Sequence, residues 1–296
     1  MLRVVDSHWC AAAGNNEGSK ANTADIKGRL RPVRENRLRN LIREGKPSLG
    51  TRVQSPWPTI TELICRTGCF DYVEFTAEYS PYDLFILENL ARATELFPNT
   101  SNMIKIPQDS WEHLAVRAMN AGFQNLLFAD IRTPEDVGKC VRAVRPETPE
   151  IGGLHGAGMS RDVGLVIEAC TPAMVEAYQD AVVALMIEKK QAVENLESLL
   201  SVQGVDMVQF GPSDYSLSIG IPGQRNHPAV KEAERYTIET ALKMGVQPRV
   251  EVGSPAQMVA YAEMGVKHFS IGLDVRVLYN WFKENGSEAR RIIEEL

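Results

Sequence analysis

Two carboxylates in the second half of the chain follow consecutive apolar runs. Glu188 closes the run 182–187, and Asp214 follows Phe210-Gly211-Pro212-Ser213 about one strand–helix unit later. Two oxygen ligands on neighbouring strand ends suit a hard divalent cation, with water or substrate oxygens in its remaining positions. Zinc would favour thiolate or imidazole ligands, and neither accompanies this pair. The alternative is that Glu188 forms a structural ion pair with a nearby lysine or arginine.

Other residues suited to proton transfer or anion binding also lie at predicted strand ends. Glu78 and Tyr79 follow the second apolar run, and Lys105 lies in the third. His155 lies in a glycine-rich loop segment, 152–158, so we expect that the loop could bring it near the same site. These side chains are candidates for catalysis or substrate binding only if the strands end at one edge of the fold.

Four charged residues fall inside predicted strands. Arg52 lies near the end of the first strand, and Arg249 lies in the seventh. Buried charges are costly unless they are paired, so we expect these arginines to form ion pairs inside the fold, with Glu74 and Glu251 as partners. Arg52 is also a candidate substrate-binding residue. The alternative is that some of the four side chains face solvent.

The elements that would position these residues alternate along the chain. Each short apolar run is followed by turn residues and an amphipathic stretch, often with Pro in its first turn and Gly after its end. Eight strands with helices between them predict a (β/α)8 TIM barrel, whose active site lies at the C-terminal strand ends. A doubly wound sheet is the competing fold, but no Gly-rich phosphate motif follows the first strand. The expected strands are 49–53, 72–78, 102–107, 125–129, 182–188, 207–211, 248–252 and 268–272, and the main helices 81–96, 111–121, 134–144, 191–201, 228–244 and 255–264.

Three segments fall outside this alternation. Residues 1–34 are largely small and polar and predict a flexible N-terminal arm, which leaves 35–296 for the barrel. Residues 145–180 are too long for an ordinary connection and predict an insertion that serves as a lid or subunit contact. The stretch 275–296 is apolar on one side, which predicts a C-terminal packing helix.

Composition excludes several functions. The 296 residues carry a net charge of −6, with no clustered basic face for nucleic-acid binding. No apolar run reaches the roughly 20 residues that span a membrane, and no signal peptide is recognisable. The five cysteines are scattered, which favours reduced thiols in a cytoplasmic protein.

Three segments together resemble a known family. Met186-Ile187-Glu188-Lys189, Gly204-Val205-Asp206 and Gly211-Pro212-Ser213-Asp214-Tyr215-Ser216 are similar to motifs of the HpcH/HpaI aldolases, which are class II 2-oxo-acid aldolases. The resemblance extends over about residues 36–278. It implies a barrel of the phosphoenolpyruvate/pyruvate type and a lyase activity on a small, pyruvate-derived 2-oxo acid. It also implies a homohexamer arranged as a trimer of dimers.

The resemblance also implies roles for the carboxylate motif. Glu188 and Asp214 would hold Mg²⁺, Mn²⁺ or Co²⁺, and this ion would stabilise a metal-bound enolate as a Lewis acid. The main chain of Gly211, Pro212 and Ser213 would help to orient the substrate carboxylate.

The sequence departs from the family pattern at the positions that the family uses for proton transfer and substrate binding. Tyr79 stands where the family has a His, Thr76 where it has the partner Asp, and Lys105 where it has an Arg. A free Tyr titrates near pH 10, whereas a His–carboxylate unit works near neutrality. We therefore take Tyr79, Lys105 and Glu78 as the candidate catalytic residues. Further departures are Met186 for a Gln, Asn120 for a helix-end Asp, and Gly153-Leu154-His155-Gly156 for Gly-x-Arg-Gly.

These departures leave several functions open. Tyr79 could act as an acid, or as a base if the metal or Lys105 lowers its pKa. The fold could instead catalyse another reaction of a pyruvate enolate, as a decarboxylase, a carbon–carbon synthase or a mutase. A homologue without catalysis is the third alternative, since a shared fold does not fix function.

Overall fold

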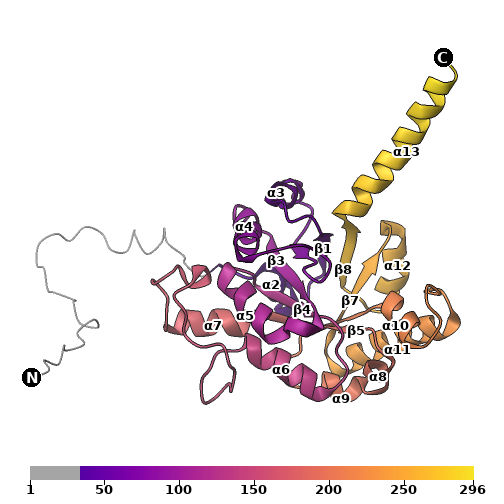
Figure 1. The fold of residues 1–296 in the computed structure, drawn as a ribbon. Helices are drawn as coiled ribbons and strands as arrows, with labels where there is room; N and C mark the ends of the chain where they lie inside the picture. The colour runs from indigo at the N-terminus through magenta and orange to yellow at the C-terminus, as the bar shows by residue number, and fades with distance from the viewer. Residues whose placement is uncertain (1–33) are drawn as a thin grey trace, which may run out of the picture. The chain divides into compact units, whose positions relative to one another are not determined.

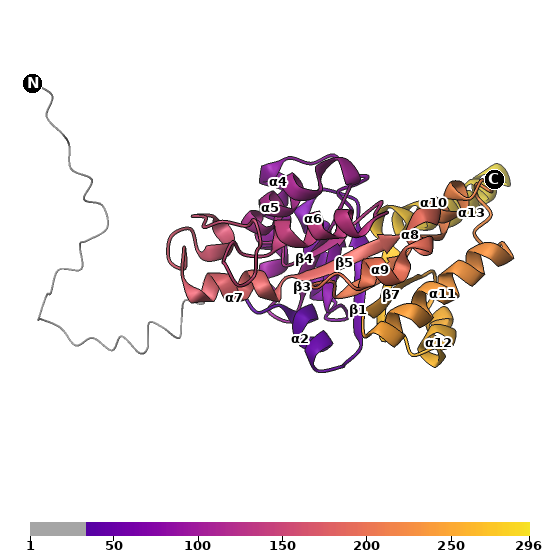
Figure 2. The same cartoon turned by 90° about the horizontal axis from the view of Figure 1, so that it is seen from below.

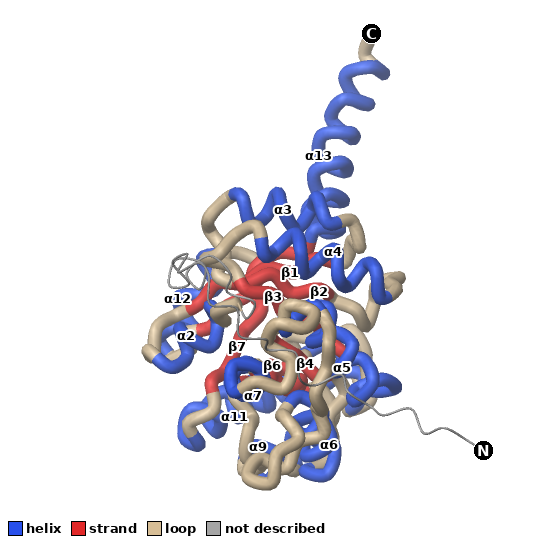
Figure 3. Tube along the Cα trace, turned by 90° about the vertical axis from the view of Figure 1, so that its left-hand side faces the viewer, coloured by secondary structure: helices blue, strands red, loops and turns tan. Residues whose placement is uncertain are grey.

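Eight parallel strands close into a barrel in chain order, with helices around them (Figures 1 and 3). A computed structural model describes residues 34–296, so the predicted arm, apart from Arg34, lies outside the described residues. The predicted (β/α)8 fold is confirmed. The strands are β1 (Ser48–Val53), β2 (Tyr72–Phe75), β3 (Ser101–Ile106), β4 (Asn125–Phe128), β5 (Val182–Ile187), β6 (Met207–Phe210), β7 (Gln247–Val252) and β8 (His268–Leu273).

The strands begin close to where the apolar runs predict, but β2 ends three residues early. The prediction extended it to residue 78, whereas the strand ends at Phe75. The following residues form a turn in which the Tyr79 N–H donates to the Thr76 carbonyl at 3.0 Å. This turn redirects the chain at the C-terminal end of the barrel and so places Glu78 and Tyr79 there.

The helices follow the capping signals closely. Thr133 and Asp136 form a reciprocal capping box at one of them, with Pro134 in the first turn. The expected helix 191–201 is broken at Asn195 into two short helices, and the Asn195 side chain donates to the Arg132 carbonyl at 3.1 Å. The helices are α2 (Arg37–Arg43), α3 (Pro58–Arg66), α4 (Leu84–Glu95), α5 (Trp111–Ala121), α6 (Pro134–Val144), α7 (Pro172–Asp180), α8 (Lys190–Glu194), α9 (Leu196–Leu200), α10 (Pro212–Ser218), α11 (Pro228–Met244), α12 (Pro255–Glu263) and α13 (Asp274–Glu294).

The N-terminal end of the barrel is covered by α2. Leu38 is fully buried in a cluster with apolar side chains from β2 to β6. Arg39 pairs with Asp206 at 2.5 Å and donates to the Ala181 carbonyl at 2.8 Å. These contacts fix α2 across the strand starts and leave the C-terminal end for the site.

The insertion between α6 and β5 contains α7 and a short 3-10 turn, Arg161–Val163. Arg161 forms an ion pair with Glu95 of α4, and Tyr178 of α7 donates to Asp162 at 2.8 Å. In two perpendicular views α7 lies on the side of the barrel away from α12 (Figures 1 and 2). The insertion is therefore an ordered subdomain packed beside α4 and α5.

The final helix, α13, is a 21-residue element that extends away from the barrel (Figure 1). Its apolar side chains are largely solvent-exposed, with Trp281 at 59% and Phe282 at 63%. Within residues 34–296, no helix combines the length and apolar character needed to cross a membrane. The C-terminal helix is thus present as predicted, and in the single chain it lacks a covered apolar face.

Candidate active site

The pairing of β5 with β6 brings the candidate metal carboxylates to one place. Ile187 lies opposite Phe210 in the register, so Glu188 emerges beside Gly211. A Cβ atom on Gly211 would lie only 2.6 Å from Oε2 of Glu188, so a glycine is needed where the two chains meet. Asp214 then follows in the first turn of α10, which starts directly at Pro212.

Burial dominates the electrostatics of this pair. Glu188 is only 2% exposed, and its Oε1 accepts the Asp130 N–H at 2.9 Å. Burial raises the pKa of Glu188 to about 7, although the positive charge of Lys105 opposes this rise. Asp214 instead lies 3.3 Å from the ammonium of Lys189, which is closer to Asp130 at 2.5 Å. The alternative of a Glu188–lysine salt bridge is therefore not what the structure shows.

The donor set fits a hard cation that takes part of its coordination from elsewhere. No group of three or more His, Cys, Asp or Glu side chains is placed to hold a metal within residues 34–296. Two carboxylates on one cavity, one of them desolvated, leave positions for water and substrate oxygens, as Mg²⁺ and Mn²⁺ commonly accept. An ammonium group already lies on Asp214, which shows that this spot favours positive charge.

A second cluster lies at the ends of β2 and β3. Nζ of Lys105 lies 2.5 Å from Oε2 of Glu78 and donates to the Tyr79 hydroxyl at 3.1 Å. The same ammonium lies 4.9 Å from the centroid of the Tyr79 ring. Burial opposes the charge on Lys105, but the negative charges around it, led by Glu188, raise the pKa of the lysine. Lys105 therefore stays cationic.

The environment of Tyr79 favours the protonated form of its hydroxyl. Burial raises the pKa of its hydroxyl to about 12, and the charge of Lys105 offsets only part of that rise. At neutral pH the phenol is protonated and can donate a hydrogen bond or a proton. Lys105 alone therefore does not lower the pKa of Tyr79 as a base role would require, and the protonated phenol can act as an acid.

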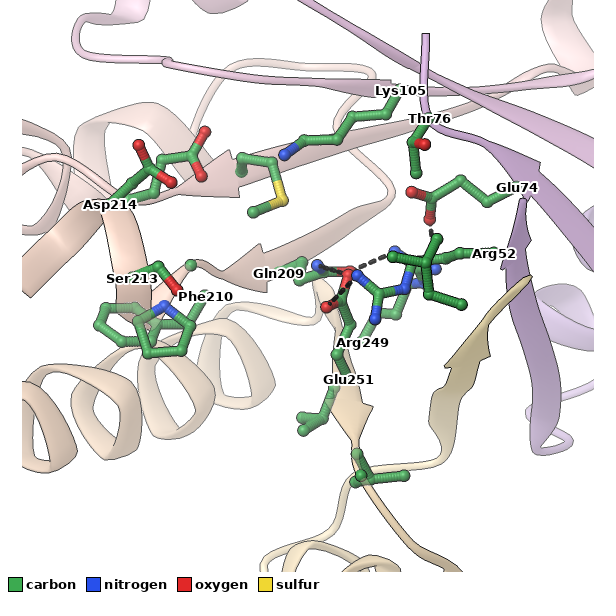
Figure 4. A pocket seen from close by; sticks show the side chains of 18 of the residues that line it. Arg52, Glu74, Thr76, Lys105, Gln209, Phe210, Ser213, Asp214, Arg249 and Glu251 are labelled. Atoms are coloured by element: carbon green, nitrogen blue, oxygen red, sulfur yellow. Dashed lines mark hydrogen bonds and ion pairs between the residues drawn. The ribbon is translucent and has the colours of Figure 1, made fainter. Parts of the chain in front are cut away.

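Both clusters open onto one cavity of about 570 Å³ (Figure 4). Its size lies within the usual range for a small-molecule site. Eight of the ten residues predicted for the site line it. They are Arg52, Tyr79, Lys105, Glu188, Gly211, Pro212, Ser213 and Asp214.

The other two predicted residues lie elsewhere. Glu78 does not line the cavity itself, but it interacts with two residues that do, Lys105 and Tyr79. Contrary to the expectation of a place at the mouth, His155 is 3% exposed, with Nε2 3.1 Å from Oδ1 of Asn120 and its ring stacked on Tyr178 at 4.2 Å. A bridge between Pro146 and His155 holds this part of the insertion against the end of α6. Burial lowers the pKa of His155, so the buried ring favours the neutral form.

Comparison with known proteins places this site in a family. The family model described as HpcH/HpaI aldolase/citrate lyase matches residues 86–280, which include β3 to β8 and both carboxylates predicted to bind a metal. The chain belongs to the HpcH/HpaI aldolase/citrate lyase family. The predicted resemblance is therefore confirmed.

Individual HpcH/HpaI-family relatives cover most of the chain. A pyruvate aldolase of Rhizobium etli is 27% identical over 86% of this chain and 95% of its own length. A hydroxypyruvate/pyruvate aldolase of Paraburkholderia phytofirmans is 30% identical over 82% of this chain and 89% of its own. Among solved structures, an HpcH/HpaI aldolase/citrate lyase family protein of Burkholderia cenocepacia is 25% identical with a TM-score of 0.78, covering 86% of this chain and all of that one.

In this HpcH/HpaI-family chain, the expected internal ion pairs are present. Arg249 pairs with Glu74, both fully enclosed in the barrel, and Arg52 pairs with Glu251 at 2.6 Å. Sequence reasoning missed Gln209, whose Nε2 donates to Oε1 of Glu251 at 2.7 Å. Its signal was a lone amide within the apolar run of β6. Missed too were Arg225 and Arg276, which line the cavity; Arg276 lies in the stretch predicted only as a packing helix.

Proposed function

We propose that this chain is a divalent-metal-dependent carbon–carbon lyase of the aldolase type, acting on a small, pyruvate-derived 2-oxo acid. The observation that carries the proposal is the meeting of Glu188, Asp214 and Lys105 at one cavity, where two carboxyl groups lie together with a fixed cation. A pyruvate aldolase and a hydroxypyruvate/pyruvate aldolase among the relatives support the substrate class.

The two sides of the cavity would have different roles, metal binding on one side and stabilisation of substrate charge on the other. Glu188 and Asp214 would hold Mg²⁺, Mn²⁺ or Co²⁺, which when bound supplies Lewis-acid stabilisation of enolate charge. Lys105, kept cationic by its neighbours, binds negative charge that develops on the substrate oxygens. Of the main chain at Gly211, Pro212 and Ser213, only the Ser213 N–H would help to orient the substrate carboxylate, because the Gly211 N–H donates to the Ile187 carbonyl at 3.0 Å and Pro212 has no N–H.

Tyr79 is the residue proposed to move the proton. In the condensation direction, the C3 carbon of the enolate forms a bond to the aldehyde carbon, and the C=O electron pair moves to the aldehyde oxygen. The protonated phenol of Tyr79 then gives its proton to that alkoxide. In the cleavage direction the steps run in reverse and start from the phenolate, a minor form that the Lys105 ammonium 3.1 Å away stabilises. The phenolate takes the proton of the C4 hydroxyl as the carbon–carbon bond breaks, and the phenol so formed gives that proton to C3 of the enolate.

The exposed apolar residues of α13 support self-association as part of the proposal. A helix with Trp281 and Phe282 facing solvent gains free energy when a second copy covers it. The homohexamer implied by the family resemblance, a trimer of dimers, is the assembly we propose, together with a cytoplasmic location.

Two measurements on the full chain test the function. In D₂O with Mg²⁺, Mn²⁺ or Co²⁺, the enzyme should exchange the C3 protons of pyruvate, and it should release pyruvate from 4-hydroxy-2-oxo acids. Glu188→Gln and Asp214→Asn should each lower metal affinity at least about 100-fold. A full equivalent of metal retained by both variants would overturn the site assignment.

A second candidate is another reaction of the pyruvate enolate, which the Tyr79 and Lys105 positions favour because they replace the usual His and Arg. Exchange of C3 protons without any cleavage of 4-hydroxy-2-oxo acids would select this candidate. Neither exchange nor cleavage with any of the three ions would indicate a homologue without catalysis.

A further inference from the structure

Five polar side chains from β1, β2, β6 and β7 lie together inside the barrel. We name them the inner polar cluster: Arg52, Glu74, Gln209, Arg249 and Glu251. Figure 4 shows them across the cavity from Asp214, with the end of the Lys105 side chain between Asp214 and Glu74 and with Thr76 beside Glu74. The proposed reaction uses none of them.

Arg249 is the centre of the cluster. It is 1% exposed, and its guanidinium donates to the Tyr72 hydroxyl at 2.6 Å and to side-chain oxygens of Gln209 and Glu74. The amide of Gln209 then donates to Glu251, which pairs with Arg52 at 2.6 Å. One continuous set of hydrogen bonds therefore extends from the barrel interior to a partly exposed arginine.

The surrounding structure is shaped to hold this arrangement. Tyr72 points across the interior, and a Cβ atom on Gly50 would lie 2.2 Å from its ring. The hydroxyl of Tyr72 also donates to the Phe269 carbonyl at 3.3 Å. Because Gly50 leaves the space that the Tyr72 ring occupies, the position of Arg249 is fixed by packing as well as by charge.

The cluster is not needed to fill the barrel. The interior beside β3 to β5 is filled by apolar side chains such as Met103, Leu127 and Ala184. Well-packed apolar residues are often as stabilising as a buried ion pair, or more so. A set of buried charges in one half of an otherwise apolar interior therefore points to a role in binding.

Two atoms of the cluster lack a hydrogen-bond partner among residues 34–296. They are Oε1 of Glu74, whose side chain is fully buried, and Nε of Arg52. Glu74 and Arg52 are register partners on β2 and β1, and both line the cavity. In Figure 4 the Glu74 carboxylate points from β2 into the cavity. A buried acceptor without a donor is costly, so a bound group is expected there.

The chemistry of that group follows from the two free atoms. Glu74 accepts a hydrogen bond and Arg52 donates one, while the two arginines and two glutamates of the cluster cancel in charge. A carboxylate would be repelled by Glu74, and an ammonium would be repelled by Arg52. A neutral hydroxyl satisfies both atoms, because it donates and accepts at once.

We propose that the inner polar cluster is the subsite for the aldehyde partner and selects a short, neutral hydroxyaldehyde, whose hydroxyl donates to Glu74 and accepts from Arg52. This inference rests on the proposed function, since it assigns the second substrate of the same reaction. Glu74 and Arg52 are the specificity-determining residues, and Arg249, Gln209 and Tyr72 are positioning residues.

The test compares matched aldehydes on the metal-loaded enzyme with pyruvate. Glycolaldehyde is paired with acetaldehyde, and glyceraldehyde with propanal, so that each pair differs by hydroxyl groups. The kcat/KM for the hydroxylated member should exceed that for its partner by at least about 100-fold, as expected where a site is built to bind a hydroxyl. Exchange of pyruvate C3 protons without aldehyde is measured in parallel and reports on the proposed function alone.

Variants separate the subsite from the fold. Glu74→Leu combined with Arg249→Met replaces the buried pair with apolar side chains, and the preference should fall about 100-fold. Arg52→Met, at a partly exposed position, should lower it about 10-fold and serves if the double variant does not fold. Arg39→Met unpairs the buried Arg39–Asp206 bridge at the other end of the barrel and should leave the preference unchanged.

Each outcome decides the proposal. Exchange by the wild type with the same preference in wild type and Arg52→Met would overturn the subsite but not the lyase. A preference for a carboxylate-bearing aldehyde over both hydroxyaldehydes would also overturn it. Absence of pyruvate exchange would overturn the proposed function and this inference together.

Discussion

Nζ of Lys105 lies 2.5 Å from Oε2 of Glu78, a carboxylate that does not line the cavity. The ammonium of Lys105, which faces the cavity, is therefore fixed by an ion pair with Glu78, a residue of the turn that follows β2. A flexible ammonium becomes a fixed one, which partly compensates for the lack of the rigid fork that an arginine would bring.

Removing the charge of Glu78 should therefore lower catalytic efficiency, although Lys105 itself is still present. We expect Glu78→Gln to lower kcat/KM for the 2-oxo acid about 10- to 100-fold, and Glu78→Asp to recover part of the loss. Steady-state kinetics with a circular-dichroism check of folding would measure this. The matched control is Glu135→Gln, which unpairs the exposed Lys139 on α6 at 3.0 Å. Equal kinetics in Glu78→Gln and wild type would contradict the assigned role.

Gly211 should tolerate no side chain. A methyl group there would lie 2.6 Å from Oε2 and 2.7 Å from Cβ of Glu188, so Gly211→Ala must displace the carboxylate. We expect metal affinity to fall at least about 10-fold, with a stability loss of about 1–3 kcal/mol from overpacking. Calorimetric titration and urea unfolding measure the two effects. Gly286→Ala on α13, with nothing within 4 Å of its added Cβ, is the control: it should leave metal affinity unchanged and should not destabilise the fold, since Ala favours a helix interior by about 0.5–1 kcal/mol over Gly.

The ionisation of Tyr79 can be followed by absorbance. Its pKa of about 12 means that the phenolate band of this residue should be absent at pH 8–10 and should form only in strong alkali. The difference between titrations of the wild type and Tyr79→Phe isolates the signal. Tyr79→Phe should also lower kcat about 100- to 10,000-fold if the phenol transfers the proton. A difference signal with a midpoint near pH 9 would contradict this account and allow a base role.

His268 should make the fold sensitive to acid. The side chain is 1% exposed, with Nδ1 2.9 Å from the Ser48 hydroxyl, and burial lowers its pKa from 6.5 to about 4, with smaller contributions from the positive charges of Lys267 and Arg249. The unfolded chain then binds the proton more readily than the folded chain between these values. Stability is therefore present above pH 6.5 and is lost as the pH falls toward 4.

From pH 7 to pH 5 this residue should account for a loss of about 2 kcal/mol. Urea unfolding at the two pH values measures the loss in the wild type, and His268→Gln should remove this part of it. The comparison between the two proteins isolates the residue from other titrating groups. An identical pH dependence in both would show that His268 does not carry the effect.

The periodic features of the fold could be predicted from the sequence because they are local. Helix starts at Pro134 and Pro228 coincide with the predicted ones, since a proline in the first turn needs only its neighbours. The meeting of Glu188 and Asp214 at one cavity could also be predicted, because a barrel places every strand end at the same rim, whereas their metal binding stays a prediction. Neither inference required knowledge of how distant segments meet.

The features that were predicted wrongly depend on contacts between segments that are distant in the sequence. The end of β2 was predicted too late because the hydrogen bond from Tyr79 to Thr76 leaves no trace in apolar periodicity. His155 was expected at the mouth, yet it packs on Tyr178, 23 residues farther along the chain. Gln209 could not be assigned a role because its partners, Arg249 and Glu251, belong to the next strand.

The cover that α2 forms over the strand starts has a consequence for the order of events. With Leu38 buried in the interior and Arg39 paired with Asp206, α2 closes the end of the barrel at the strand starts, so substrates should enter and leave at the opposite end. When a barrel is open at one end, the substrate that binds deeper in the cavity must bind first and dissociate last. The aldehyde, whose hydroxyl would bind the fully buried Glu74 inside the barrel, should therefore enter before the 2-oxo acid at the rim carboxylates, and initial-rate kinetics should follow a compulsory-order pattern.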